Sequence, residues 1–260
     1  MGATICLTRA EGQNAKLADR LTSAGFRVVL FPTIAFEPPP DTRIVKTAIA
    51  HIANYDWLVF TSKNAVHFFS DYLRAADVPT QQLPRTAVVG SATARALEKH
   101  GIHVDLIPTD YHAEGLIAAF EQFSPGEGHR VLIPRALKAR EILPETLRER
   151  GFEVTVAPVY QTVRPEPTPN QWAGLVDADD QPRPDAIVFT SPSTVKNFGD
   201  ILIEDAELDP THFLNRMQVF SIGAVTTEAL REAGVESARI AQAEKSTSAG
   251  LAAVICNTLA

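Results

Sequence analysis

Short apolar segments alternate with amphipathic segments along almost the whole chain. The short segments are rich in β-branched residues and predict buried strands at 5–8, 28–31, 57–61, 87–89, 104–107, 131–133, 154–157, 186–190, 219–222 and 238–241. Near-continuous apolar strands are typical of parallel sheets covered by helices on both faces. The amphipathic segments predict helices, each followed by a glycine that suits a helix end, at 15–24, 92–100, 141–150 and 226–233. This alternation predicts an α/β fold.

The two halves of the chain resemble each other. Four segments of the first half return in the same order in the second, with 5–9 matching 131–135, 59–62 matching 188–191, 90–101 matching 223–234, and 115–116 matching 250–251. The offset grows from 126 residues (135 − 9) to 135 residues (250 − 115), as small insertions would produce. We therefore interpret the chain as a duplicated α/β unit and expect five parallel strands in each copy, the number found in flavodoxin-like folds.

Proline-rich segments at 31–40 and 158–169 follow the matching strand–helix–strand parts of the two copies. Because proline suits exposed connections, we expect the chain to cross between two domains at both places. This predicts a discontinuous domain of residues 1–35 and 164–260 and a continuous domain of residues 36–163, a circular permutation of the first. Two sequential domains that divide near residue 127 remain the alternative.

Composition and charge exclude several classes of protein. With 24 basic and 31 acidic residues the formal charge is −7, which argues against a broad nucleic-acid surface. No apolar run approaches the roughly 18 residues that span a bilayer, and residues 1–9 do not resemble a secretory signal, so we expect a cytoplasmic protein without a membrane segment. Cys6 and Cys256 lack the spacing of metal ligands and are expected to be buried, reduced thiols.

Hydroxyl, amide and basic residues follow the predicted strands, where helices begin. In open parallel sheets, ligands bind beyond the carboxyl ends of the strands, and helix N-termini offer N–H groups to anions. We therefore expect an anion-binding cleft formed by Arg9, Thr61, Ser62, Asn64, Gly90, Ser91, Thr93, Arg135, Thr190, Ser191, Ser193, Gly223, Thr226, Thr227 and Lys245. The alternative is that the hydroxyl and amide residues only cap helices and that Arg9 and Arg135 are ordinary surface ions.

The common signatures of reactive sites are missing from the sequence. It has no glycine-rich dinucleotide or phosphate loop and no Gly-x-Ser-x-Gly nucleophile turn. His100 and His103 flank Gly101 at a predicted helix end, which does not suit a metal site. We expect a site without metal, cofactor or activated nucleophile.

Five segments resemble motifs of the uroporphyrinogen-III synthase family and occur in the family's order. They are residues 59–66, 89–94, 158–162, 188–193 and 222–230. In the last of them the family often has Gly-Pro-Thr-Thr, from which Ala224 and Val225 depart. The likeness extends from Arg9 to Leu251 and so covers nearly the whole chain.

The resemblance implies two flavodoxin-like domains joined by a two-stranded linker. It implies a cofactor-free lyase of tetrapyrrole biosynthesis that acts on hydroxymethylbilane, a linear tetrapyrrole with eight carboxylates. The terminal hydroxyl leaves as water, ring D attacks through its substituted carbon, and the spiro intermediate recloses with that ring inverted. The partner would be this small molecule alone, and the enzyme would be a monomer that could receive the substrate from the preceding enzyme of the pathway.

The resemblance also assigns roles to residues. Tyr160 matches a tyrosine proposed to assist the departure of the hydroxyl, although a tyrosine here could simply pack its ring. Thr93, Thr226 and Thr227 match site threonines, Ser191 and Ser193 match a Ser-Pro-Ser segment, and Lys245 is a weaker match.

Two other classes of function remain as alternatives for this chain. Two α/β lobes around a hinge also form small-anion binding modules, such as solute-binding proteins. A two-domain glycosyltransferase-like enzyme would use a nucleotide sugar, and nucleoside diphosphates would then stabilise the protein against heat.

Overall fold

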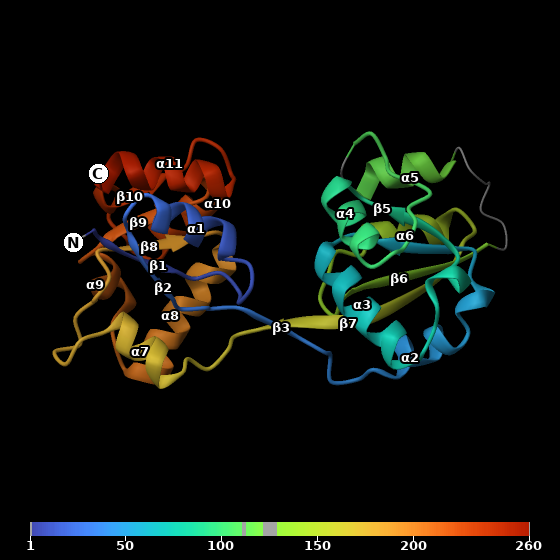
Figure 1. The fold of residues 1–260 in the computed structure, drawn as a ribbon, viewed down its shortest axis with the longest axis horizontal. Helices are drawn as coiled ribbons and strands as arrows, with labels where there is room; N and C mark the ends of the chain where they lie inside the picture. The colour runs from blue at the N-terminus through green and yellow to red at the C-terminus, as the bar shows by residue number, and fades with distance from the viewer. Residues whose placement is uncertain (1, 111–112, 122–128, 260) are drawn as a thin grey trace. The chain divides into compact units, whose positions relative to one another are not determined.

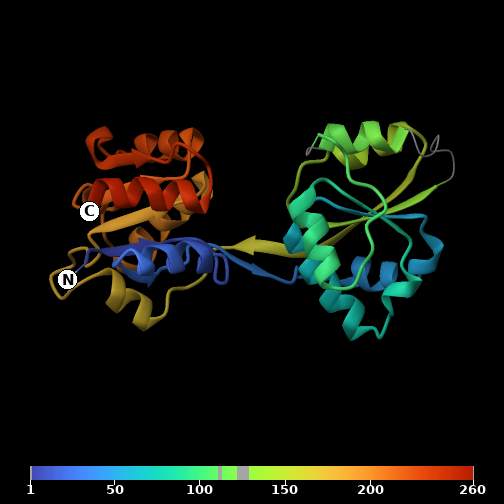
Figure 2. The same cartoon turned by 45° about the horizontal axis from the view of Figure 1, so that its top comes forward.

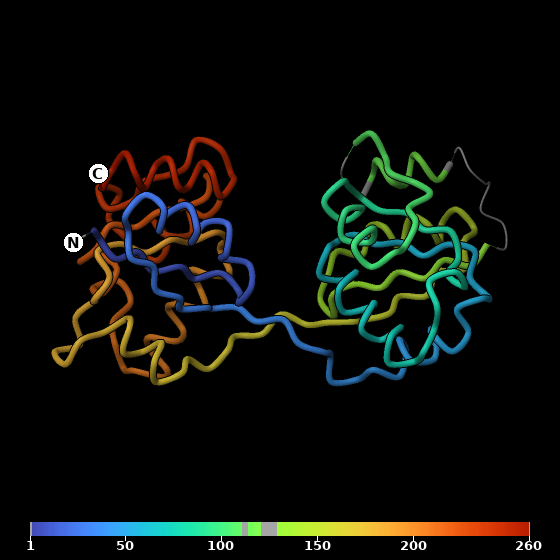
Figure 3. Tube along the Cα trace, in the orientation of Figure 1, coloured from blue at the N-terminus to red at the C-terminus, as the bar shows by residue number. Residues whose placement is uncertain are grey.

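The computed structural model describes residues 2–110, 113–121 and 129–259. The chain divides into two compact units, which we call unit 1 (Met1–Ala35 with Val163–Ala260) and unit 2 (Phe36–Thr162). The trace in Figure 3 shows the first segment of the chain, in blue, within the same unit as the last segments, in orange and red. Each unit contains one five-stranded sheet (Figure 1).

The sheet of unit 1 has the order β10-β9-β8-β1-β2, and all its neighbours are parallel. Its strands are β1 (Thr4–Leu7), β2 (Arg27–Leu30), β8 (Ala186–Phe189), β9 (Gln218–Ser221) and β10 (Ile240–Gln242). Numbered within the unit, this order is 2-1-3-4-5, which is the flavodoxin-like arrangement. The order reverses between β1 and β8, so the switch point of this sheet lies between them.

Helices cover both faces of this sheet (Figure 2). They are α1 (Ala15–Ser23), α7 (Pro169–Leu175), α8 (Pro192–Ala206), α9 (Pro210–Leu214), α10 (Ala224–Glu232) and α11 (Ser248–Leu259), with a short 3₁₀ turn at Ser237–Arg239. Ile5 and Leu7 of β1 pack with α1 and α11, whereas Cys6, between them, packs on the opposite face with α8. Such two-sided burial explains why the central residues of the strands are apolar.

The sheet of unit 2 has the order β3-β7-β6-β4-β5. Its strands are β3 (Ala35–Glu37), β4 (Trp57–Phe60), β5 (Arg85–Val88), β6 (Arg130–Ala136) and β7 (Glu153–Val163), and the pairs β7–β6, β6–β4 and β4–β5 are parallel. Through the repeat, β7 corresponds to β2, β6 to β1, β4 to β8 and β5 to β9. The switch point of unit 2 therefore lies between β6 and β4.

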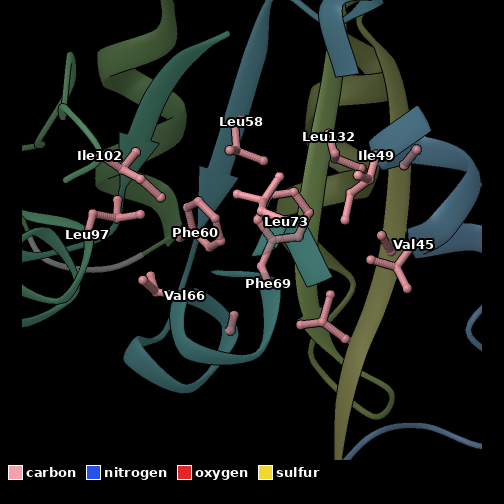
Figure 4. Close-up of a cluster of buried hydrophobic side chains, with 14 of the residues drawn as sticks. Val45, Ile49, Leu58, Phe60, Val66, Phe69, Leu73, Leu97, Ile102 and Leu132 are labelled. Carbon is pink, nitrogen blue, oxygen red and sulfur yellow. The ribbon is translucent and has the colours of Figure 1, made fainter. Parts of the chain in front are cut away.

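The helices of unit 2 also enclose their sheet. They are α2 (Arg43–Ala50), α3 (Lys63–Ala75), α4 (Ser91–Lys99), α5 (Ala113–Glu121) and α6 (Ile142–Glu149), with 3₁₀ turns at Ile52–Asn54 and Thr80–Gln82. Figure 4 shows the core on one face, where Phe60 and Leu58 of β4 meet Phe69 of α3 and Leu97 of α4. On the other face, Trp57 and Val59 pack among residues of α5 and α6.

The four predicted helices are α1, α4, α6 and α10, with ends within two residues of the prediction. Gly25 and Gly151, at equivalent places of the repeat, follow α1 and α6 with φ of 90° and 85°, which the left-handed end of a helix requires. Cys6 is buried as expected, and its burial raises the pKa of the thiol, whereas Cys256 is only partly buried.

The predicted strand at 104–107 is wrong. Only Leu106 bridges to Ala87, and the fifth position of the sheet is taken by β3, at the opposite edge beside β7. The backbone N–H groups of Asp105 and Leu106 both donate to the carbonyl of Thr86, and the Asp105 carboxylate accepts from the N–H of Thr86. These bonds use up the groups that a longer ladder would need, and the following Pro108 has no N–H to donate.

Candidate functional site

The switch point of unit 1 carries a half-buried basic residue, Arg9. Thr8 and Arg9 follow β1, and the buried Thr8 hydroxyl donates to the carbonyl of Val188 on β8 over 2.7 Å. Arg9 is half-buried, and this burial lowers the pKa of its guanidinium. Within the part of the chain that the structure describes, no side chain or carbonyl pairs with this guanidinium. A half-buried cation without a partner favours an anionic ligand.

The N-terminus of α8 lies beside this point and combines a capping role with an accessible hydroxyl. Ser191 caps the helix, because its Oγ accepts a hydrogen bond from the N–H of Thr194 over 3.3 Å. The Oγ1 of Thr194 in turn accepts a hydrogen bond from the N–H of Ser191. The Ser193 hydroxyl is exposed and lies 2.9 Å from Ser191 Oγ. Thr190 is partly exposed just before the cap. Capping therefore explains Ser191, while Ser193 can still reach a ligand.

The threonines of α10 lie deeper than the sequence suggested. Thr227 is only 5% exposed, and its Oγ1 lies within hydrogen-bond distance of Ser221 Oγ (2.6 Å), Gln242 Oε1 (2.8 Å) and the carbonyl of Gly223 (3.2 Å). Thr226 is buried as well. The hydroxyl of Thr227 thus joins β9, β10 and α10, and its only proton is engaged within the protein, so it has none to donate to a substrate carboxylate.

Gly223 and Lys245 border the same edge of unit 1. A Cβ on Gly223, which precedes α10, would stand 2.8 Å from Ser246 Oγ, so a glycine lets the two loops approach. Lys245 is exposed.

The corresponding edge of unit 2 begins with Ser62, which caps α3 by accepting from the N–H of Ala65 over 3.1 Å. Thr61 is exposed and Asn64 is partly exposed beside it. At the next helix, Gly90 and Ser91 are partly exposed where α4 begins. Thr93 in the first turn is buried.

Tyr160 on β7 brings a hydroxyl to this edge. Tyr160 is 8% exposed, and its ring stacks on that of Phe68 and meets that of Phe36 edge-on, with centroid distances of 5.4 Å and 5.7 Å. Its hydroxyl lies 3.4 Å from Ser62 Oγ. The packing thus holds the ring, and the hydroxyl ends beside the capped start of α3.

Arg135, at the end of β6, is the counterpart of Arg9 but is engaged within its own loop. It is 7% exposed, forms an ion pair with Glu141, and donates from Nη1 to the carbonyl of Arg140 over 2.9 Å. Its buried Nε has no acceptor among the described residues. Arg135 lines a cavity of about 320 Å³ at the switch point, together with Thr61, Glu114, Arg140 and Ile142.

This cavity was not predicted from the sequence. Our expectation selected hydroxyl and basic residues after strands, whereas part of the cavity wall is apolar, formed by Val89, Ile142 and Leu143. Ile142 belongs to the amphipathic pattern of a helix, and no periodicity indicates that its side chain faces a cavity.

In residues 2–110, 113–121 and 129–259, no three His, Cys, Asp or Glu side chains are placed to hold a metal ion. His100 instead lies beside His67, with ring centroids 6.1 Å apart, and His103 Nε2 lies 3.8 Å from Asp105 Oδ1. No helix in the described part of the chain is long and apolar enough to span a bilayer.

A family model described as uroporphyrinogen-III synthase HemD matches residues 15–253. The chain belongs to the uroporphyrinogen-III synthase family. This assignment, which confirms the resemblance seen in the motifs, places the chain among the cyclising lyases of porphyrin biosynthesis. It takes precedence over the binding module and the glycosyltransferase that the sequence had left open.

Relatives within the family cover nearly the whole chain. The uroporphyrinogen-III synthase of Synechococcus elongatus is 34% identical over 234 residues, which are 89% of this chain and 87% of the relative. That of Chlorobaculum parvum is 30% identical and covers 90% of each chain. The crystal structure of uroporphyrinogen-III synthetase from Helicobacter pylori shares the fold, with a TM-score of 0.60 at 19% identity, over 99% of this chain and 100% of that one.

Proposed function

We propose that this chain cyclises hydroxymethylbilane to uroporphyrinogen III, with loss of water and inversion of ring D. The observation that carries the proposal is the matched pair of switch points. In both units a βα turn brings an arginine to the place where open α/β sheets bind their ligands: Arg9, which has no partner among the described residues, and Arg135, which pairs with Glu141 and lines the cavity of unit 2. A substrate with eight carboxylates suits a protein that presents two such edges.

Binding would be spread over many weak contacts. The helices α3, α4, α8 and α10 all begin at the carboxyl edges of their sheets and direct N–H groups there. Each anion at a helix N-terminus contributes about 0.3–1 kcal/mol when exposed and more when desolvated. Together these contacts would hold a flexible bilane in a folded shape with its reacting carbons close, which is where orientation contributes most to the rate.

We assign Tyr160 as the general acid of the first step. Its hydroxyl, 3.4 Å from Ser62 Oγ, would donate a proton to the leaving hydroxyl as the C–O bond breaks, so that water departs and the pyrrole nitrogen supplies the electrons. The final ring closure releases a proton from a carbon of ring D, and this proton restores the tyrosine. The stacked Phe68 would keep the ring in place throughout.

We further propose that units 1 and 2 act as the two domains of a monomer, each binding part of the same substrate through its carboxyl edge. In this arrangement the half-buried cation of Arg9 takes a carboxylate in unit 1, while the general acid is supplied by unit 2.

The test is incubation with freshly generated hydroxymethylbilane, followed by chromatographic separation of the isomer I and isomer III products. Without enzyme the bilane closes without inversion, so we expect isomer III only where active protein is present. Isomer I alone, at the rate of a heat-inactivated control, would overturn the proposal. Thermal melting with nucleoside diphosphates serves as a second control, because a nucleotide-sugar enzyme would be stabilised and this one should not be.

A further inference from the structure

Three large apolar side chains at the carboxyl edge of unit 2 are left exposed. Leu137 and Ile142 follow β6 and are each 42% exposed, and Ile107 follows the bridge at Leu106 and is 44% exposed. Exposed apolar groups that gather beside polar ones often mark a ligand site. None of them belongs to the anion-binding set selected from the sequence.

Ile142 borders the cavity at the switch point between β6 and β4. Val89 and Leu143 add to its apolar wall, while Arg135, Arg140 and Glu114 add charged groups. The cavity measures about 320 Å³. This lies at the lower end of the range for small-molecule sites, about 300–1,000 Å³, so it suits one substituted ring and not a whole four-ring substrate.

The charges of the cavity match a ring with acidic substituents. Arg140 is exposed, and no described carboxylate pairs with it, whereas Arg135 already pairs with Glu141. Arg140 is therefore the cation available to a carboxylate of the ligand.

We propose that this cavity holds a single pyrrole ring of the bilane, with one face of the ring against Ile142 and Leu143 and an acidic substituent at Arg140. The proposal rests on the proposed function and deepens it, because it places one ring of the substrate in unit 2. The cavity thereby fixes the position of that ring relative to the hydroxyl of Tyr160, which belongs to the same unit.

The chain offers a matched pair of variants for the test. Ile142 is the first residue of α6 and Ile44 the second residue of α2, both helices have eight residues and lie in unit 2, and the two side chains are 42% and 48% exposed. Ile142→Ala and Ile44→Ala should therefore fold equally well. The probe is a monopyrrole carrying one acetate and one propionate, titrated into the full chain by calorimetry and by methyl NMR of the isoleucines.

We expect the monopyrrole to shift the Ile142 methyl signals and not those of Ile44. Ile142→Ala should weaken its binding about tenfold, as expected for losing the apolar contact of one branched side chain, and Ile44→Ala should leave it unchanged. With the bilane, Ile142→Ala should raise KM more than it lowers kcat. Equal affinity of both variants for the monopyrrole, or no saturable binding to the wild type, would overturn the proposal.

The proposed function is measured separately, by the isomer III that the wild type forms. If the wild type forms no isomer III, the proposed function fails, whatever the monopyrrole does. If the wild type forms isomer III and Ile142→Ala matches it in both assays, only the pyrrole pocket is wrong.

Discussion

Arg9 and Arg135 occupy the same place in the two copies of the repeat, yet their surroundings differ. Arg9 is half-buried and has no counter-ion in the described chain, whereas Arg135 is almost fully buried and pairs with Glu141. The loop after Arg9 contains a glutamate too, Glu11, but this side chain forms no ion pair with Arg9. The two matching arginines therefore differ in what engages their guanidinium groups: that of Arg135 is held by its own loop, and that of Arg9 has no partner in the described chain.

The copies differ in a second way. Tyr160 of unit 2 corresponds to Ile34 of unit 1 (160 − 126 = 34), and Thr227 of unit 1 corresponds to Ala94 of unit 2 (227 − 133 = 94). The hydroxyl that we propose as the general acid therefore has no counterpart at the matching position of unit 1, and the Thr227 hydroxyl has none at the matching position of unit 2. Both differences can be tested by single substitutions.

The largest effect should come from Tyr160→Phe. This change keeps the ring between Phe68 and Phe36 and removes only the hydroxyl. General acids contribute about 10²–10⁴-fold, and because the pyrrole itself drives ionisation we expect a loss of roughly ten- to a hundredfold in kcat. KM and the melting temperature should stay near the wild-type values, and the product should still be mainly isomer III. Wild-type turnover would show that another group, such as a bound water, supplies the proton.

Arg9→Gln should lower kcat/KM about tenfold, since a charge-assisted hydrogen bond to a carboxylate is worth about 1.5–3 kcal/mol. Stability should stay the same or rise slightly, because the variant no longer buries an unpaired charge. Steady-state kinetics and chemical denaturation measure the two effects. The control is Arg27→Gln, at the amino end of β2, the opposite edge of the same sheet. If both variants lose activity equally, the effect is one of general charge and not of the Arg9 site.

Thr227→Ala gives unit 1 the residue that unit 2 has at this place. It removes the hydroxyl shared by Ser221, Gln242 and Gly223, and we expect the free energy of unfolding to fall by about 1–2 kcal/mol. Activity per folded molecule should stay unchanged. Thr227→Ser keeps the hydroxyl and should restore most of the stability. A large loss of kcat in a stable Thr227→Ala protein would return this residue to the substrate-binding set.

Arg135→Gln should have the smallest effect. Its partner Glu141 is half exposed, so solvent screens the ion pair. The variant loses this ion pair and the hydrogen bond to the Arg140 carbonyl, and together these losses should lower the free energy of unfolding by about 1 kcal/mol. We expect a smaller fall in kcat/KM than for Arg9→Gln, measured under the same conditions. The reverse order would mean that Glu141 gives way to the substrate and that Arg135 is the stronger anion site.

Much of the architecture could be predicted because it depends on local patterns. Helices α1, α4, α6 and α10 follow from amphipathic periodicity and from the glycines that end them. The two-fold repeat is visible as matched segments. The segment 104–107 shows where this reasoning fails: its apolar residues suit a strand, but whether it pairs depends on Thr86, which bonds instead to Asp105.

For the site, strand ends and helix starts are local features, so the residues at the carboxyl ends of the strands could be predicted from the sequence. Which of these residues are available to a ligand depends on contacts made in the folded chain. Gln242 lies 15 residues from Thr227 and occupies its hydroxyl, while Ser62 lies 98 residues from Tyr160 and meets its hydroxyl. The cavity beside Ile142 likewise needs Thr61, Val89 and Glu114 from three separate segments of the chain. Burial and hydrogen-bond saturation arise from residues distant in the sequence, and no local pattern contains them.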